Sequence, residues 1–300
     1  MNTAWIQQQL DEAKADGLER KARVYPEAGG IIKIDDKDVL NFSSNDYLDL
    51  GRHRHVMDCS REALDEYGIG STASRLVTGT LPIHNELEAR IANEKGYEAA
   101  LVFGSGYMAN AGTIPVLVGR DDLIFADKLV HASMIDACKL SGAKLVRWAH
   151  NDVQALEKRL QQYTDSTARK LIITESVFSM DGDIAPLAAI ADLASNYETM
   201  LMVDEAHSTG AFGPNGAGLV RELGLEKAVT VSMGTMSKAM AGYGGYVACS
   251  SSLRQLLVSS SRAFIYTTAP PPSVIGGALG ALDVFESSPR LGNILQANAD

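Results

Sequence analysis

The segment TMLMVDEAH at residues 199–207 places a short, continuous apolar run directly before three polar side chains. A run of this length without polar interruption is typical of a strand buried on both faces of a sheet. In sheets covered by helices on both faces, ligands bind beyond the carboxyl ends of the strands. Asp204, Glu205 and His207 therefore stand where a binding site is expected.

Six further segments resemble this strand, and helical patterns alternate with them. The other expected strands are 100–103, 123–126, 144–148, 170–174, 229–232 and 245–248. The expected helices in this region are 86–95, 108–117, 133–140 and 153–161. Strands that alternate with helices predict an α/β domain of three layers.

The two ends of the chain differ from this pattern. Residues 5–23 predict a polar helix, and 31–34 with 39–42 predict a short hairpin whose turn is 35–38. These elements form an N-terminal arm, residues 1–45, ahead of the large domain at 46–282. The last residues, 289–300, predict a helix without a cap, so we expect the protein to continue or to have been cut there.

Composition excludes several classes of protein. The 300 residues are 46% hydrophobic and 21% charged, which is ordinary for a globular protein and excludes disorder. A formal charge of −10 argues against nucleic acid as a partner, although a small anion could bind a local basic pocket. The apolar runs are too short to cross a membrane, and residues 1–7 lack a secretion signal.

The cysteines point to the compartment. Cys59, Cys138 and Cys249 are few, odd in number and widely spaced. Such usage favours a reducing cytoplasm, and the spacing between these cysteines predicts no metal site.

Two strand ends carry features that are weak when taken alone. The glycines of Gly104-Ser105-Gly106 let a ligand approach the backbone, and the helix that follows points free N–H groups at an anion such as phosphate. A tight strand-to-helix turn explains the same residues equally well. His131 could stack on a planar ligand or act as an acid–base group, although a lone histidine there is more often a helix cap or a core residue.

The next two strand ends carry hydroxyl and carboxylate groups. Ser179 lies in a polar loop after residues 170–174 and could donate to a ligand oxygen. The letters DEAH at 204–207 also occur in a helicase motif, but the chain has no phosphate loop of the type that motif requires. A carboxylate at the end of a buried strand, such as Asp204, can instead pair with a protonated ring nitrogen of a ligand. His207, three residues later, could then reach the neighbouring substituent of that ring.

Lys238 completes the set. It follows the expected strand 229–232 among small hydroxyl residues, and a partly desolvated lysine at a ligand site is a Schiff-base nucleophile. Alone, such a lysine would be a surface residue. Together, a phosphate loop, a stacking histidine, a ring-nitrogen aspartate and an imine lysine predict a pyridoxal 5'-phosphate pocket.

The chain resembles the α-oxoamine synthases, a fold-type I group of pyridoxal-phosphate enzymes. The matching motifs run in order along the chain: NFSSNDYL at 41–48, GIGS at 68–71, SRLVTG at 74–79, His84, SGY at 105–107, HAS at 131–133, VFSMDG at 177–182, DEAH at 204–207, 235–238 and YTTAPP at 266–271. The resemblance implies a three-layer αβα large domain with a mostly parallel seven-stranded sheet. It also implies a small C-terminal domain, of which residues 283–300 are the start and the rest is missing.

The resemblance implies a role for each matching residue. Lys238 carries the cofactor imine and moves the substrate proton, Asp204 pairs with the ring nitrogen, and His131 stacks on the ring and contacts substrate. The other cofactor-binding residues it implies are Gly106, Tyr107, Ser179, His207, Thr235 and either Thr267 or Thr268, the last two reaching the phosphate of the neighbouring subunit in a homodimer. It implies substrate contacts from Asn45 and from Arg20, with Arg23 as the alternative, and no metal.

The implied reaction is a decarboxylating condensation. The resemblance is nearest to the member that joins L-alanine to pimeloyl-CoA, or to the carrier-protein equivalent, in biotin biosynthesis. Glycine C-acetyltransferase and 5-aminolevulinate synthase share the cofactor residues and stay open as alternatives. A catalytically silent scaffold subunit is less favoured because Lys238 is present, and a dinucleotide-binding module lacks the third spaced glycine.

Overall fold

The computed structural model describes residues 3–26 and 28–299. The chain divides into two compact units, Met1–Ser44 and Asn45–Asp300. Each unit is described by itself below.

The first unit holds one helix and one hairpin, both shifted from the expected bounds. Helix α1, Ala4–Ala15, is shorter than the expected 5–23, because the chain turns at Gly17 with a φ of +68°. Strands β1, Ile31–Ile34, and β2, Lys37–Leu40, are antiparallel and pair Ile34 with Lys37. The turn is therefore only Asp35-Asp36, both at positive φ, rather than the expected 35–38.

The second unit is built on a seven-stranded sheet of order β3-β9-β8-β7-β6-β4-β5. Its strands are β3 (Ala99–Phe103), β4 (Leu123–Asp127), β5 (Lys144–Trp148), β6 (Lys170–Glu175), β7 (Met200–Asp204), β8 (Val231–Thr235) and β9 (Gly245–Cys249). Strand β9 is antiparallel to both of its neighbours, and the other six strands run in one direction. The predicted mostly parallel, seven-stranded α/β sheet is confirmed, and six carboxyl ends lie at one edge.

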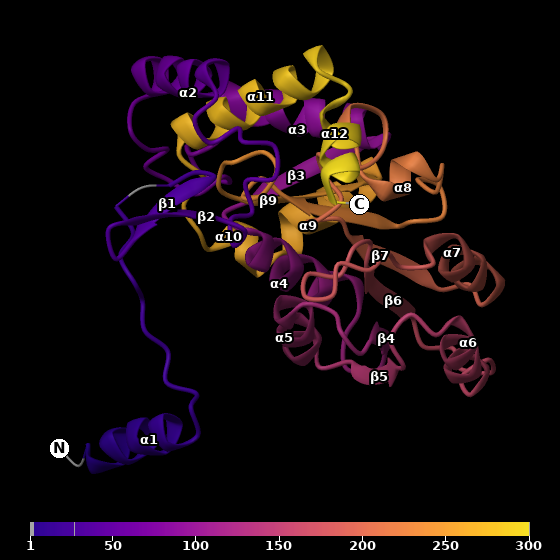
Figure 1. The fold of residues 1–300 in the computed structure, drawn as a ribbon. Coiled ribbons are helices and arrows are strands. Elements are labelled where there is room, and N and C mark those ends of the chain that lie inside the picture. Colours follow the sequence, from indigo (N-terminus) through magenta and orange to yellow (C-terminus); the bar gives the residue numbers. More distant parts are fainter. Residues whose placement is uncertain (1–2, 27, 300) are drawn as a thin grey trace. The chain divides into compact units, whose positions relative to one another are not determined.

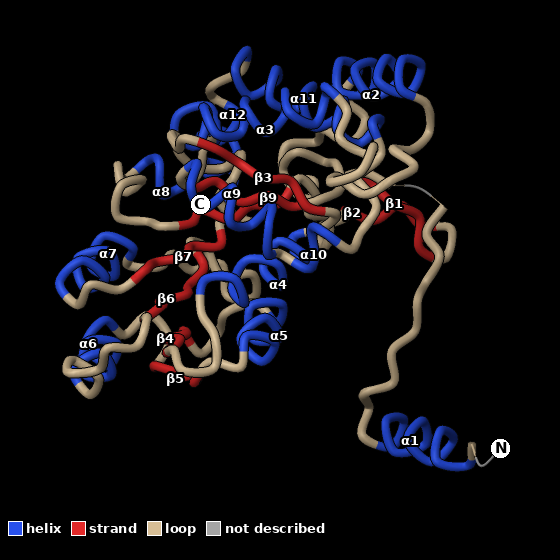
Figure 2. Tube along the Cα trace, turned by 180° about the vertical axis from the view of Figure 1, so that it is seen from behind, coloured by secondary structure: helices blue, strands red, loops and turns tan. Residues whose placement is uncertain are grey.

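Helices cover both faces of this sheet. Figure 1 shows α4 and α5 on one side of β4, β6 and β7, with α6 and α7 on the other, and Figure 2 shows the same layers from behind. The helices are α2 (Arg54–Tyr67), α3 (Pro82–Lys95), α4 (Gly106–Leu117), α5 (Ala132–Ser141), α6 (Val153–Gln161), α7 (Leu187–Asn196), α8 (Leu219–Glu222), α9 (Ser251–Ser260), α10 (Arg262–Ile265), α11 (Pro272–Ser287) and α12 (Leu291–Ala299), with a 3₁₀ turn at Pro214–Gly216. The core between the layers consists of fully buried aliphatic and aromatic side chains from the strands and the inward helix faces.

Helix α11 packs along α2 at very short distance (Figure 1). A Cβ added at Gly276 would lie 2.5 Å from the carbonyl oxygen of Cys59, and one at Gly280 would lie 3.0 Å from the Cα of Val56. Glycine at these positions therefore permits the close approach. The domain boundary predicted after residue 282 falls inside α11, and that division stays a prediction.

Strand β8 ends later than expected. The sequence predicts its end at Ser232, whereas the strand continues through Thr235. Position 234 has no room for a side chain, because Tyr246 of β9 lies against it: an added Cβ would be 2.3 Å from the Tyr246 hydroxyl oxygen. Thr235 is therefore part of the sheet edge itself.

Two further features bear on the expectations from composition. In the described ranges, no helix is both long enough and apolar enough to cross a membrane. Cys59, Cys138 and Cys249 are all free thiols.

Candidate active site

A cavity of about 240 Å³ lies at the carboxyl edge of the sheet, inside the second unit. It is lined by residues that follow the ends of β3, β4, β6, β7 and β8: Ser105, Gly106, Tyr107, Asn110, His131, Ser133, Glu175, Asp204, Ala206, His207, Met233, Thr235, Ser237 and Lys238. The structure thus brings together seven of the predicted residues: Gly106, Tyr107, His131, Asp204, His207, Thr235 and Lys238.

Asp204 ends strand β7 with a buried carboxylate. Its Oδ2 accepts a hydrogen bond of 3.0 Å from the Asn110 side-chain amide, and its Oδ1 accepts one of 3.0 Å from the backbone N–H of Ala206. These donors favour the charged carboxylate and fix its direction. A buried carboxylate that faces a cavity suits a cationic ring nitrogen.

His131 is both the N-cap of α5 and a wall of the cavity. Its Nδ1 lies 2.8 Å from Ser133 Oγ and accepts from the Ser133 backbone N–H at 3.2 Å. Asn110 donates to Ser133 Oγ at 2.9 Å, so the hydroxyl proton of Ser133 points to Nδ1. This network makes Nδ1 of His131 an acceptor and leaves Nε2 as the ring nitrogen that can donate.

Lys238 begins a chain of hydrogen bonds. Its Nζ lies 2.5 Å from His207 Nε2, His207 Nδ1 lies 2.7 Å from the Tyr47 hydroxyl, and Tyr47 donates to Asn45 Oδ1 at 3.2 Å. Burial lowers the pKa of His207 to about 4, and the charge of Lys238 acts in the same direction. His207 is therefore neutral, accepting from Lys238 and donating to Tyr47.

The surroundings of Lys238 favour its neutral form. Burial lowers the pKa of Lys238, and the nearby carboxylates of Asp204 and Glu175 only partly oppose this. A lysine with a lowered pKa offers a free amine, which is the form that attacks a carbonyl or takes a proton.

The opposite end of the cavity suits a phosphate. Helix α4 begins at Gly106 with Ser105 as its N-cap, so the N–H groups of Gly106 and Tyr107 are not used within the helix. A Cβ added at Gly106 would lie 3.1 Å from Met233 Cε and 3.5 Å from Thr235 Cβ, so only glycine leaves this entrance open. Ser237 Oγ and Thr235 Oγ1, 2.7 Å apart, add hydroxyl groups beside it.

These residues fit pyridoxal phosphate. The cavity offers an anion site, a buried carboxylate for the ring nitrogen, and a desolvated lysine beside His207. Asn110 Oδ1 is a buried polar atom without a partner at the same cavity, which leaves an acceptor for a bound group. The donor set therefore matches the groups of the cofactor.

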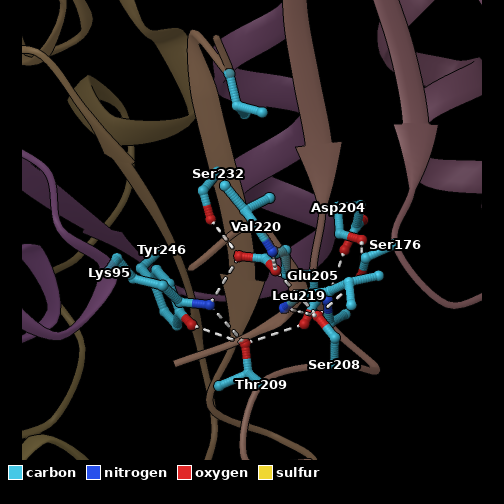
Figure 3. Close-up of polar contacts among 12 residues, drawn as sticks. Lys95, Ser176, Asp204, Glu205, Ser208, Thr209, Leu219, Val220, Ser232 and Tyr246 are labelled. Carbon is cyan, nitrogen blue, oxygen red and sulfur yellow. Dashed lines mark hydrogen bonds and ion pairs between the residues drawn. The ribbon is translucent and has the colours of Figure 1, made fainter. Parts of the chain in front are cut away.

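Glu205 has a different task from its neighbours in the DEAH motif. Figure 3 shows its carboxylate within a buried cluster that Lys95, Ser232 and the backbone of Val220 complete. Lys95 Nζ lies 3.0 Å from Glu205 Oε2, and both side chains are almost fully buried. Glu205 thus anchors the turn that carries Asp204 and His207.

Sequence reasoning missed several polar residues of the site, including Ser237 beside Thr235. Glu175 and Asn110 line the cavity, Ser133 orients His131, and Tyr47 bonds His207. Burial, with the charge of Asp204, raises the pKa of Glu175 to about 8. Their signal in the sequence was position: Glu175 directly follows the apolar strand residues, as Asp204 does on β7.

Several predicted residues do not line the cavity. Ser179 is exposed in the loop after β6, where its backbone N–H bonds Glu175. Thr267 and Thr268 lie between α10 and α11, and Arg20 and Arg23 lie in the first unit. Their roles, and that of Asn45 beyond its bond to Tyr47, stay predictions.

One cluster outside the cavity contains metal-ligand types: His55, Cys59 and Asp283. His55 Nε2 lies 2.7 Å from Asp283 Oδ2, and Arg90 binds the other oxygen of that carboxylate. These groups neutralise one another, and the prediction of no metal site stays a prediction.

Comparison with known proteins identifies the family of the chain. The family model for class I and II aminotransferases matches residues 37–297. An 8-amino-7-oxononanoate synthase from Anaeromyxobacter sp. (strain K) is 47% identical over 286 residues, which are 95% of this chain and 71% of that protein.

Solved structures of pyridoxal-phosphate enzymes are also similar to this chain. Serine palmitoyltransferase from S. paucimobilis, with a bound pyridoxal phosphate–myriocin aldimine, matches with a TM-score of 0.91 at 32% identity, over 98% of this chain and 74% of that one. An 8-amino-7-oxononanoate synthase from Francisella tularensis matches with a TM-score of 0.72 at 34% identity, over 86% and 72%. The predicted cofactor, pyridoxal phosphate, and the predicted fold type are confirmed, and the chain belongs to the class I and II aminotransferase family.

Proposed function

We propose that this protein is an 8-amino-7-oxononanoate synthase. It condenses L-alanine with pimeloyl-CoA, or with the pimeloyl thioester of a carrier protein, and releases 8-amino-7-oxononanoate, CO₂ and the free thiol. The observation that carries the proposal is the cavity with Lys238 between Asp204 and His207, in a chain 47% identical to a protein of that name.

Bound pyridoxal phosphate supplies an electron sink for the charge left on the amino-acid α-carbon when its proton leaves. Asp204 makes that sink effective, because its buried carboxylate keeps the ring nitrogen protonated. The N–H groups at the start of α4, with Thr235 and Ser237, hold the phosphate end.

Lys238 is the base that takes the α-proton at its Nζ. Burial lowers the lysine pKa, which favours the free amine that a base requires. The neutral ring of His207 accepts a hydrogen bond from Nζ and keeps the amine directed into the cavity. Tyr47 and Asn45 continue this line of hydrogen bonds and hold the imidazole in one orientation.

His131 stabilises the oxygen that gains charge during decarboxylation. Its Nδ1 is occupied by Ser133, so its Nε2–H is the donor available to a substrate carboxylate or a developing ketone. The ring also lines the cavity, which suits stacking on the cofactor.

We propose that two subunits complete each other's sites in the cytoplasm. Thr267 and Thr268 lie outside the cavity of their own chain, which fits a hydroxyl that reaches the phosphate bound by the neighbouring subunit. Arg20 or Arg23 completes the substrate site. The unpaired cysteines support a reducing compartment.

The visible spectrum of the protein with pyridoxal phosphate tests the proposal. We expect an imine band that shifts on addition of L-alanine and much less with glycine, and that is absent in Lys238→Ala. Formation of 8-amino-7-oxononanoate from L-alanine and pimeloyl-CoA should follow. A band that responds to glycine instead would contradict the assignment and favour glycine C-acetyltransferase or 5-aminolevulinate synthase.

A further inference from the structure

Glu175 is a buried carboxyl group of the cavity that the proposed reaction does not use. It is the last residue of β6, and in the sheet register it pairs with Asp204 at the end of β7. Residues paired in neighbouring parallel strands project from the same face, so the two carboxyl groups enter the cavity side by side. Both residues are at most 5% exposed.

The carboxyl group of Glu175 accepts hydrogen bonds from two separate loops. Its Oε1 lies 2.6 Å from the backbone nitrogen of His131, at the start of α5. The backbone N–H of Ser179, in the loop after β6, also bonds this carboxyl group. One side chain thus joins the loop that carries the stacking histidine to the loop that carries the hydroxyl group predicted to bind the cofactor.

Apart from Glu175, these loops are joined further from the cavity through His150, whose Nδ1 lies 2.9 Å from Asp127 Oδ1 at the end of β4. The His131 ring is oriented by Ser133, and the far end of the Ser179 loop is held by Asp183, whose Oδ2 lies 2.7 Å from His150 Nε2. Phe178 packs edge-on against His150. Glu175 is placed to set the distance between the two loops across the cavity.

We propose that Glu175 is a positioning residue that holds the loop of His131 and the loop of Ser179 in one geometry beside the cavity. The cofactor part of this inference rests on the proposed function. The loop geometry does not, because the contacts belong to the chain alone.

The neighbouring carboxyl group of Asp204 favours the neutral form of Glu175. Burial and the adjacent Asp204 raise the pKa of Glu175 to about 8, although its two backbone N–H donors and the charge of Lys238 act in the opposite direction. A glutamine at 175 would keep the neutral charge and the acceptor oxygen.

Amide hydrogen exchange of the protein without cofactor tests the positioning role directly. Glu175→Ala leaves two backbone N–H groups without their acceptor, so we expect exchange in both segments 129–134 and 177–182 to rise at least about tenfold. Glu175→Gln should restore protection in both. Thr174→Val is the matched control: it changes a buried side chain on the same strand and should leave both segments unchanged.

A rise in one segment only, or equal loss in the Gln and Ala variants, would overturn the proposal. If Glu175→Ala does not fold, the NMR amide signals of His131 and Ser179 in Glu175→Gln supply the test. Both should shift together, since both bond the substituted group, and unchanged signals would contradict the role.

With cofactor, Glu175→Ala should bind pyridoxal phosphate about tenfold more weakly, while Glu175→Gln binds within about threefold of the wild type. Failure of the proposed reaction would leave the exchange results intact, so the two ideas can be separated. Normal cofactor affinity in Glu175→Ala together with normal exchange would reject the positioning role.

Discussion

At the scale of single residues, the cavity depends on two histidines held in defined hydrogen-bonding states. His131 accepts at Nδ1 from Ser133 and keeps a proton on Nε2, whereas His207 accepts at Nε2 from Lys238 and donates from Nδ1 to Tyr47. The cavity thus combines an amine whose pKa is lowered by burial with the carboxyl group of Asp204. This balance favours proton removal from carbon over simple ion pairing.

Asp204→Asn tests the charge. We expect the variant to fold and bind cofactor, since an amide can still hydrogen-bond, but to exchange the α-proton of L-alanine about 10²–10³ times more slowly. Exchange measured by NMR in deuterated buffer reads this out without the acyl donor. An unchanged rate would show that Asp204 does not set the ring charge.

The pH dependence of stability tests the neutral Glu175. Its pKa rises from 4.5 to about 8 on folding, so the folded state binds more protons than the unfolded state between these values. Wild-type stability should therefore fall as pH rises from about 4.5 to 8, by on the order of a few kcal/mol, relative to Glu175→Gln. The groups that face Glu175, namely Asp204 on β7, Lys238 after β8 and His131 before α5, are the same in both proteins.

Denaturant unfolding of the two proteins at several pH values measures this difference. A stability gap that stays constant across the range would mean that Glu175 is ionised in the folded state.

The sequence predicted the site residues that stand in local motifs. It did not predict those whose place in the site depends on how distant segments align. Asp204, His207 and Lys238 each stand in a recognisable local motif. Glu175 ends its strand in the same way as Asp204, but its pairing with that residue depends on the alignment of β6 with β7, which the local sequence does not specify. Tyr47 bonds a residue 160 positions away.

At the scale of elements, the buried ion pair of Lys95 and Glu205 joins the end of α3 to the turn after β7 (Figure 3). Thr209 and Tyr246 complete the surroundings of this pair, with Thr209 Oγ1 3.0 Å from Lys95 Nζ and 3.1 Å from the Tyr246 hydroxyl. The pair thus links a helix that covers the sheet to the turn that presents His207.

Lys95→Met should destabilise the fold by about 3–5 kcal/mol, because Glu205 would keep a buried charge without its cation. Lys95→Met with Glu205→Gln should recover part of this loss. Denaturant unfolding of both single variants and the double variant measures the coupling. Additive losses would show that the two side chains do not stabilise each other.

Helix α11, which sequence reasoning missed, owes its structure to packing. Helix α11 contains Gly276, Gly277 and Gly280, which disfavour a helix by local preference. Their lack of side chains lets the backbone of α2 approach, and the packing gained outweighs that preference. The strands, in contrast, were predictable, because short continuous apolar runs bounded by turn residues are typical of buried strands.

At the scale of the whole molecule, the proposed shared site can be tested by mixing two inactive variants. Lys238→Ala lacks the base, and a Thr267→Ala, Thr268→Ala double variant lacks the hydroxyls proposed to serve the neighbouring subunit. Random pairing makes half of the dimers mixed, each with one complete site, so about a quarter of wild-type activity should return.

Activity of the unfolded and refolded mixture measures this recovery, with each variant refolded alone as the control. Absence of recovery in mixtures that contain mixed dimers would place both threonines in the site of their own subunit.

The order of strands in the sheet has a consequence for synthesis of the protein. Strand β3 is a sheet edge that pairs only with β9, although about 140 residues separate them along the chain. During translation, therefore, β3 has no partner until the ribosome has released Cys249. The glycine-rich start of α4 directly follows β3, so we expect the nascent chain to acquire affinity for pyridoxal phosphate late and abruptly, after β9 emerges.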